Sequence, residues 1–328
     1  MPTTHHLMSQ MLSPEAVEIL VCPVCGSRLD FDGALTCAGC GQTYEVVDGI
    51  PILLPPDDGS VARQYRENYD RIATDDLAKP IVANRERILH SKLLRFIGDT
   101  RGASVLDIGS AYGSHLRELD ARRKVAVDLA LPYLRTISPE SVTARVCGDA
   151  EALPVDVGAF DVIIVADVLE HLLEPEKLVA RLARDCRPDT RIIIHIPWQE
   201  SLEQYEDSQY EFVHLRSFDE YSFRLLFRDF RVVRERKSLP ILNEPIVFRL
   251  KRKVPRRLYE SLVRAYFRST LSATEARHRD RWSAELPDRE RWLLWFYEPA
   301  CRMFELRLQP NARRWESLTS RVLLRDRT

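Results

Sequence analysis

Short apolar runs alternate with helix-like segments through the middle of this 328-residue chain. The runs that read as strands are "SVLDI", "KVAVDL", "ARVCGD", "FDVIIVAD", "RIIIHIP" and "FRVVRER", and a further one, "SRVLLRD", lies near the C-terminus. Strands in alternation with helices predict an α/β fold with a doubly wound, mostly parallel sheet. Because ligands of such sheets bind beyond the carboxyl ends of the strands, functional residues are expected there.

The first of these strands leads into a glycine turn within "ASVLDIGSAYGSH", where three residues separate Gly109 from Gly113. Acidic residues end the next two strands. Asp128 follows Asp107 by twenty-one residues, and a carboxylate there can accept hydrogen bonds from both hydroxyls of a ribose. Asp149 ends the third strand before "AEALP", where a carboxylate can meet an adenine amine. The series therefore predicts a cofactor that contains a nucleoside.

This series, with "FDVI" and "EHL" after it, resembles the class I S-adenosylmethionine-dependent methyltransferases over roughly residues 60–240. The resemblance implies a Rossmann-like, seven-stranded sheet and S-adenosylmethionine as the cofactor, with the glycine turn against its methionine part. Ala111 departs from the family's pattern by a methyl group that the turn can accommodate. The residues that the resemblance assigns to the cofactor are Asp107, Gly109, Ser110, Gly113, Asp128, Leu129, Asp149, Ala150 and Asp167.

Methyl transfer requires that cofactor and acceptor be aligned and kept from water, and a hydroxyl acceptor also needs a group that takes its proton. Histidines near strand ends are the candidates. We expect His171, in "DVLEHL", and His214, in "QYEFVHLRSFDEY", to be the catalytic residues on the acceptor side. His214 resembles a histidine that lies over the acceptor pocket of related methyltransferases. His195, inside "RIIIHIP", is expected to be a hydrogen-bonded core residue.

Asp167, Glu170 and His171 form the pattern D-x-x-E-H, which resembles the E-x-x-E-H of quinone-biosynthesis O-methyltransferases. A divalent cation held by these three side chains is one interpretation. The favoured one is that they support the cofactor loop. Tyr65 and Tyr69 precede the core on a predicted helix, and they either cap the cofactor or pack against the sheet.

Four of the seven cysteines form two C-x-x-C pairs within "CPVCGSRLDFDGALTCAGC". Two such pairs supply the four thiolates of a tetrahedral zinc site. Since protein fills all four positions, a structural Zn²⁺ held by Cys22, Cys25, Cys37 and Cys40 is expected. The surrounding residues 15–55, which include "TYEVVDGIP", resemble the small zinc-ribbon family that activates several RNA and protein methyltransferases.

Charge is unevenly distributed, although the net charge is only -1. Residues 1–230 carry 24 basic and 37 acidic side chains, whereas residues 231–328 carry 24 basic and 12 acidic ones. The basic part reads as a helical insertion with three interpretations. It caps the acceptor pocket, it contacts anionic membrane lipid or a lipid-linked substrate through residues 246–300, or it binds RNA phosphates. RNA ranks last, because the acidic body would repel it.

The predicted organisation has six parts. They are a flexible N-terminus (1–14), a zinc ribbon (15–55), a linker with N-terminal helices (56–100), the methyltransferase core (101–245), a helical insertion (246–315) and the last strand of the core (316–328). A hydrophobic share of 45% without any apolar run of 18 residues excludes disordered and membrane-spanning classes. Without a signal-peptide pattern, a cytoplasmic location is expected, with peripheral contact at the inner membrane face as an alternative.

These features predict an S-adenosylmethionine-dependent methyltransferase with its zinc ribbon fused in the same chain. The expected reaction is methylation of an oxygen on a small-molecule, saccharide (glycan) or lipid-linked acceptor. One alternative is an RNA base methyltransferase, because zinc ribbons also precede the catalytic domain of some ribosomal RNA methyltransferases. A second is an inactive methyltransferase fold that acts as a binding module. The joint presence of Asp128 and Asp149 argues against that module.

Overall fold

A computed structural model describes residues 12–56, 59–77, 92–200, 202–205, 208–238 and 301–309. Nine strands within these ranges form one central sheet. From one edge to the other they are β11 (Phe230–Ser238), β12 (Cys301–Leu308), β10 (Arg191–Pro197), β9 (Val162–Ala166), β6 (Ser104–Ile108), β7 (Arg123–Asp128), β8 (Ala144–Gly148), β5 (Ile50–Leu53) and β4 (Val46–Val47). The neighbours from β10 through β5 all run parallel, whereas β12 is antiparallel to both β10 and β11.

Helices cover both faces of this sheet, as the alternation of strands and helices in the sequence predicts. Their bounds are α2 (Pro14–Glu18), α3 (Ser60–Leu77), α5 (Ser114–Glu118), α6 (Leu131–Arg135), α7 (Pro175–Asp185) and α8 (Glu220–Leu226). Short 3₁₀ turns are η1 (Pro139–Ser141), η2 (Ala150–Ala152), η3 (Val157–Ala159) and η4 (Leu202–Tyr205). Within the described part of the chain, no helix combines the length and the apolar character that crossing a bilayer requires.

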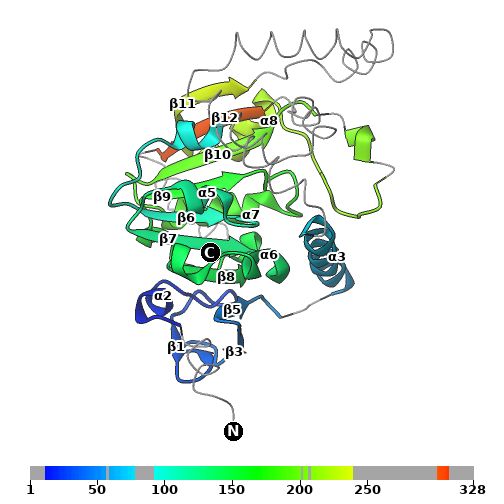
Figure 1. The fold of residues 1–328 in the computed structure, drawn as a ribbon. Helices are drawn as coiled ribbons and strands as arrows, with labels where there is room; N and C mark the ends of the chain where they lie inside the picture. The colour runs from blue at the N-terminus through cyan, green and yellow to red at the C-terminus, as the bar shows by residue number, and fades with distance from the viewer. Residues whose placement is uncertain are drawn as a thin grey trace, which may run out of the picture.

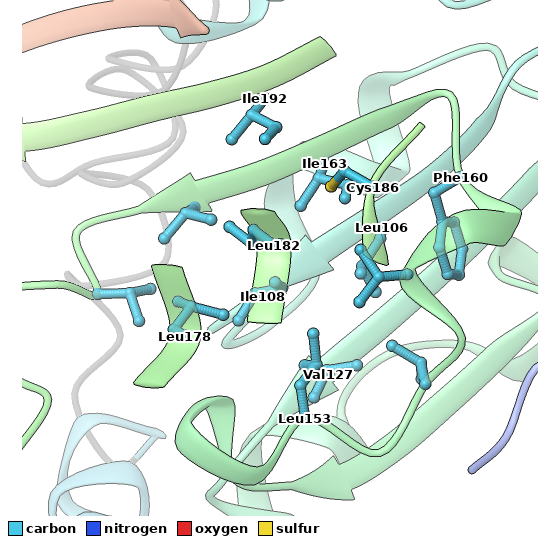
Figure 2. Packing of buried hydrophobic residues seen from close by; sticks show 14 of the residues in the cluster. Leu106, Ile108, Val127, Leu153, Phe160, Ile163, Leu178, Leu182, Cys186 and Ile192 are labelled. Atoms are coloured by element: carbon cyan, nitrogen blue, oxygen red, sulfur yellow. The ribbon is translucent and has the colours of Figure 1, made fainter. Parts of the chain in front are cut away.

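Two hydrophobic clusters lie on the two faces of the sheet. One contains α7, and Figure 2 shows Leu178 and Leu182 of this helix together with Ile108 of β6 and Ile163 of β9. The other cluster joins α5, α6 and the helical residues 92–97 to side chains that alternate with the first set along the strands. Alternate residues of one strand thus face opposite layers, which explains why the central strands are buried along their whole length.

The strand β12 corrects the predicted end of the core. Residues 246–315 are predicted to form a helical insertion, but Cys301–Leu308 is a strand between β10 and β11. The last strand predicted at 316–328 lies outside the described residues. The error has a physical reason, because an apolar run such as "ACRMFELRL" fits a buried strand as well as a buried helix. Here Phe304 stacks on Phe223 of α8 at 4.0 Å between ring centroids. Residues 239–300, which contain most of the insertion, and residues 310–328 lie outside the described residues.

The cysteine-rich segment forms a small three-stranded sheet and then joins the main one. The small sheet consists of β1 (Leu29–Phe31), β2 (Leu35–Cys37) and β3 (Thr43–Tyr44). The following β5 pairs in parallel with β8, with Ile52 opposite Cys147 and Leu53 opposite Gly148. Figure 1 shows the cysteine-rich segment at the β8 end of the sheet and β11 at the opposite end. The segment predicted as a separate ribbon therefore contributes an outer strand pair to the main sheet.

Candidate functional site

A cavity of about 340 Å³ opens at the carboxyl ends of β6, β7, β8 and β9. This is the position at which a doubly wound sheet binds its ligand. Seven of the nine residues predicted to contact the cofactor line the cavity, and so does one of the two predicted catalytic histidines. They are Gly109, Ser110, Asp128, Leu129, Asp149, Ala150, Asp167 and His171.

The glycine turn after β6 forms the floor of the cavity. Gly109 has a φ of +71°, and a Cβ atom there would lie 2.3 Å from Cγ2 of Val168, so only glycine fits. Ala111 is also left-handed, with a φ of +44°, and its N–H donates to Oδ2 of Asp128 at 2.8 Å. The alanine that departs from the glycine pattern is thus held in its strained conformation by the next acidic residue along the sheet.

Asp128 is the most deeply buried carboxylate of the cavity wall. Its Oδ1 accepts a second backbone hydrogen bond, from the N–H of Ala130 at 2.9 Å. Burial raises the pKa of Asp128 to about 6, although both backbone hydrogen bonds act to lower it. Each carboxylate oxygen has a further lone pair. At pH 7 the side chain is therefore ionised and able to accept from two neighbouring hydroxyls.

Asp149 stands one strand further along. Its side chain caps η2, accepting from the N–H of Glu151 at 2.8 Å, and burial raises its pKa. The cap fixes the carboxylate at the end of β8 beside Gly148. Two carboxylates on adjacent strand ends thus face one cavity, as the sequence predicts.

Two residues assigned to the cofactor do not line the cavity. Asp107 is fully buried under the turn, 3.2 Å from Nδ1 of His115, and Gly113 caps the start of α5 with a φ of +67°. Both act on the shape of the turn. Among the described residues, Oδ1 of Asp107 and Oγ of Ser110 have no hydrogen-bond partner, so buried polar atoms at the turn remain for a ligand or water to satisfy.

Aromatic residues of α3 close another side of the cavity. Tyr65 and Tyr69 both line it, and their hydroxyls donate to the carbonyls of His171, at 3.3 Å, and Phe212, at 3.1 Å. Burial raises the pKa of both phenols, so they stay neutral donors. The tyrosines thus line the ligand cavity and also pack against the loops beyond β9 and β10.

Some lining residues were not singled out in the sequence. Tyr133 of α6 donates to Asp76 of α3 at 2.8 Å, and Tyr210 and Val213 come from the segment that also carries His214. The signal for the last two was present, since they stand inside the quoted run "QYEFVHLRSFDEY". Nothing in the local sequence around Tyr133 marks it, because its place depends on α3.

His171 and His214 lie next to each other, on the loops that follow β9 and β10. Their rings are 4.6 Å apart and almost perpendicular, and His171 alone of the two lines the cavity. Burial lowers the pKa of His171 to about 4, so its ring is neutral at pH 7. Nδ1 of His214 lies 2.5 Å from Oε2 of Glu200, a partner that the sequence did not suggest.

The predicted trio Asp167, Glu170 and His171 is only partly brought together. Ligand atoms of Glu170, His171 and His214 all lie within 4.8 Å of one another, and Asp167 is not a member of this group. Asp167 instead pairs with Nδ1 of His195 at 2.9 Å, which confirms that His195 is hydrogen-bonded. The trio that the structure assembles is therefore Glu170, His171 and His214.

The four paired cysteines come together in the N-terminal segment that contains β1, β2 and β3. All four sulfurs lie within 4.8 Å of one another, with 3.7 Å from Cys22 to Cys40 and 3.4 Å from Cys25 to Cys37. A tetrahedral site with Zn–S bonds of about 2.3 Å places its sulfurs about 3.8 Å apart. The donor set thus fits zinc. Backbone N–H groups of Gly39 and Cys40 point at the sulfur of Cys37, as expected for thiolate ligands.

Comparison with known proteins finds relatives both for the segment that forms the cavity and for the cysteine-rich segment. A family model described as a methyltransferase domain matches residues 106–194, and one described as a Trm112p-like protein matches residues 14–49. A malonyl-[acyl-carrier protein] O-methyltransferase of Marinomonas sp. is 25% identical over 152 residues, covering 43% of this chain and 55% of that protein. The chain therefore spans about half the length of that relative.

The N-terminal region has closer relatives. A UPF0434 protein of Bordetella petrii is 51% identical over 41 residues, which cover 12% of this chain and 67% of that protein. Among solved structures, the complex between the Haloferax volcanii Trm112 methyltransferase activator and a methyltransferase matches with a TM-score of 0.50 and 15% identity, over 75% of this chain and 97% of the matched one. That match supports the fold. The chain therefore contains a methyltransferase domain over residues 106–194 and a Trm112p-like zinc-ribbon region over residues 14–49, and its fold is that of a methyltransferase.

Proposed function

We propose that this enzyme transfers a methyl group from S-adenosylmethionine to an oxygen atom of a small-molecule, saccharide or lipid-linked acceptor. One observation carries the proposal. Asp128, Asp149 and the histidine His171 all line a single cavity. Carboxylates that can bind a nucleoside and a histidine that can face an acceptor thus share one cavity, as group transfer between two bound molecules requires.

The residues that would hold the cofactor follow from the geometry of the strand ends. Asp128 would accept from the ribose hydroxyls, and Asp149 with Ala150 would contact the adenine. Gly109 and Ser110 would lie against the methionine part, with the carboxylate of Asp107 fixing the turn below them. When bound, S-adenosylmethionine supplies a methyl group that is already activated on a sulfonium. The protein therefore needs to bind, orient and exclude water rather than build an electrophile.

The acceptor end would be formed by His171 and the aromatic side chains beside it. His171 is neutral at pH 7 because of its lowered pKa, so its ring offers a lone pair to an acceptor hydroxyl. His214 stands behind it, oriented by Glu200. The hydroxyl proton would leave towards this pair as the oxygen–methyl bond forms. Tyr65 and Tyr69 would keep water from the reacting atoms.

Transfer to oxygen is also the reaction in the printed name of the Marinomonas relative, whose acceptor is a malonyl group on an acyl-carrier protein. If the acceptor of the present enzyme were a carboxylate, it would carry no proton at pH 7, and His171 would then not be needed as a base. RNA and an inactive binding module remain the alternatives to be tested. The direct test incubates the protein with methyl-labelled cofactor and fractionated cell extract. Label in small molecules, glycan or lipid supports the proposal, whereas label in RNA alone, or none, contradicts it.

The cofactor assignment has a separate test. Asp128→Ala should abolish binding of S-adenosylhomocysteine in calorimetry, since it removes the acceptor of both ribose hydroxyls. A matched control is Asp99→Ala, which removes an exposed carboxylate that pairs with Arg101 on the surface. Unchanged affinity in Asp128→Ala would refute the assignment.

A further inference from the structure

The side chains of Glu170, His171 and His214 come from two loops that follow β9 and β10 and meet beside the cavity, which His171 lines. One ligand atom from each lies within 4.8 Å of the others. Two imidazoles and one carboxylate at this spacing match the protein donors of an open metal site. We propose that this trio binds a divalent transition-metal ion, with Zn²⁺ as the ion that best suits the donors. With the ion bound, Nε2 of His171 would be a metal ligand, and the ion would replace this ring as the group that activates the acceptor hydroxyl. The inference rests on the proposed function only for this role.

Each imidazole already has a partner on one ring nitrogen. Nδ1 of His171 donates to the carbonyl of Val213, and Nδ1 of His214 donates to the carboxylate of Glu200 at 2.5 Å. Metal-binding histidines are held in this way, by a carbonyl or a carboxylate on the nitrogen opposite the metal. The arrangement leaves Nε2 of each ring as the nitrogen that can bind an ion.

Glu170 provides an independent observation. Its side chain is buried, with only 1% of the residue exposed, and in the described part of the chain neither carboxylate oxygen has a hydrogen-bond partner. A buried carboxylate is stable when it is paired, protonated or bound to a cation. No described lysine or arginine is paired with Glu170, whereas two imidazoles stand beside it. A metal ion between the three would satisfy both oxygens' need for a positive partner.

The two loops are also fixed to each other. The N–H of Leu215 donates to the carbonyl of Glu170 at 2.8 Å, and the guanidinium of Arg216 donates to the carbonyls of Leu169, Leu172 and Leu173. These hydrogen bonds hold the two loops, and with them the proposed metal ligands, together in the absence of an ion. Such preorganisation is what a metal site needs in order to bind tightly.

The ion would take part in methyl transfer through the acceptor. Three protein donors leave at least one position of a tetrahedral ion open. An acceptor hydroxyl bound there would lose its proton to water more readily, because the ion stabilises the alkoxide. The oxygen–methyl bond would form as the sulfur–methyl bond breaks, leaving S-adenosylhomocysteine and a methyl ether. No oxidation or reduction is involved.

The experiment counts zinc in the full-length protein. Wild type is dialysed against excess Zn²⁺, freed of unbound metal by gel filtration and analysed for metal. We expect two zinc ions per wild-type chain, and one in Glu170→Gln and in His214→Gln, both of which keep the shape of the side chain approximately. His195→Gln alters the neighbouring histidine that pairs with Asp167, and it should retain two. One zinc in wild type, or two in Glu170→Gln, would overturn the proposal.

Calorimetry with S-adenosylhomocysteine on the same samples separates this inference from the proposed function. Binding within about twofold of wild type in Glu170→Gln would show that the variant is folded, so that a lost zinc is a local loss. If wild type binds the nucleoside but holds one zinc, the metal inference fails and the proposed function stands. If wild type binds no nucleoside, the proposed function fails whatever the zinc count.

Discussion

The two clusters of metal-binding side chains in this chain differ in number of donors, in position and in attachment. Four thiols lie in the ribbon segment, which Figure 1 shows at the β8 end of the sheet, and none of them lines the cavity. Glu170, His171 and His214 form a set of three, of which His171 lines the cavity. A set of four leaves no position for a substrate, whereas a set of three leaves one. If both sets bind zinc as we propose, the first would serve folding and the second would serve chemistry.

The ribbon's attachment explains how a metal distant from the cavity can still affect it. Ile19, Leu20 and Leu53 of the ribbon belong to the same hydrophobic cluster as the central strands. The N–H of Val21 donates to the carbonyl of Pro154 at 3.0 Å. β5 pairs with β8 at Gly148, and Gly148 and Asp149 line the cavity. The ribbon therefore supports the strand end that presents Asp149.

The largest effect is expected for Cys37→Ser, which removes a buried thiolate of the complete cluster. Structural zinc contributes about 10 kcal/mol or more to the folding of isolated zinc fingers. Even a loss of about 4 kcal/mol would lower the melting temperature by about 10 °C at 2–4 °C per kcal/mol. We expect no bound zinc in the ribbon and weakened nucleoside binding, measured by metal analysis, thermal unfolding and calorimetry.

Cys147→Ala is the matched control for that variant. Cys147 is a buried thiol on β8 outside the cluster, and it should keep the full zinc content. Normal stability of Cys37→Ser would contradict a folding role for the ribbon's metal. Deletion of residues 1–55 asks the same question of the whole segment. A truncated protein with full solubility and activity would show that the ribbon is dispensable.

A smaller effect is expected when Zn²⁺ is added to protein whose ribbon is already loaded. An ion that binds only the folded state at 100 times its dissociation constant stabilises it by about 2.7 kcal/mol. The melting temperature should rise by about 5–10 °C at 2–4 °C per kcal/mol in wild type. The shift should be absent in Glu170→Gln. An equal shift in both proteins would mean that zinc stabilises through some other group.

Nucleoside binding should depend on pH through Asp128, which belongs to neither cluster. Its pKa of about 6 means that the accepting, ionised form prevails above pH 6. Affinity for S-adenosylhomocysteine should therefore fall about tenfold between pH 7.5 and pH 5, one unit below that pKa. Asp128→Asn should bind weakly with a flat profile, and Glu170→Gln should keep the wild-type profile. A flat wild-type profile would remove the proposed role of Asp128.

The same raised pKa makes the free energy of unfolding of the unliganded protein change with pH in the direction opposite to the affinity. The folded state holds the proton of Asp128 more tightly than the unfolded state does. This contribution to the free energy of unfolding is present at low pH and is lost as the pH rises through about 6. Affinity and unliganded stability should thus change in opposite directions between pH 5 and pH 7.5, which calorimetry and thermal unfolding can compare.

The predictable parts of the site are those that depend on one strand and its own loop. Gly109, Asp128 and Asp149 follow strand ends, so alternation of strands and helices is enough to bring them together. The pairing of Glu170 with His214 depends on two loops that meet only in the folded chain. Local sequence suggested Asp167 as the third partner, but its carboxylate faces His195 on β10.

The unpredicted parts of the fold are long-range strand pairings. The sequence predicts helix for residues 301–308, because the periodicity of a buried apolar run does not distinguish helix from strand. The pairing with β10 and β11 decides that these residues form β12. The pairing of β5 with β8 joins residues 95 positions apart, and no motif within the ribbon predicts it. Neither pairing is encoded in a local motif, so the edges of the sheet could not be predicted from the sequence as well as the strand ends at the cavity.

The smallest effect is expected at an exposed ion pair between ribbon and core. Arg135 and Asp48 form an ion pair at 2.9 Å, with about half of each side chain exposed, and such pairs contribute about 0.5 kcal/mol. Arg135→Gln should therefore barely change the free energy of unfolding in denaturant, with zinc content unaltered. Arg135 is the side to change, because Asp48 has a φ of +53° and its substitution would also alter backbone strain. Leu53→Ala, at a fully buried position of β5, should cost about 2–5 kcal/mol instead. A larger cost for Arg135→Gln than for Leu53→Ala would mean that charge, rather than the shared sheet and core, attaches the ribbon.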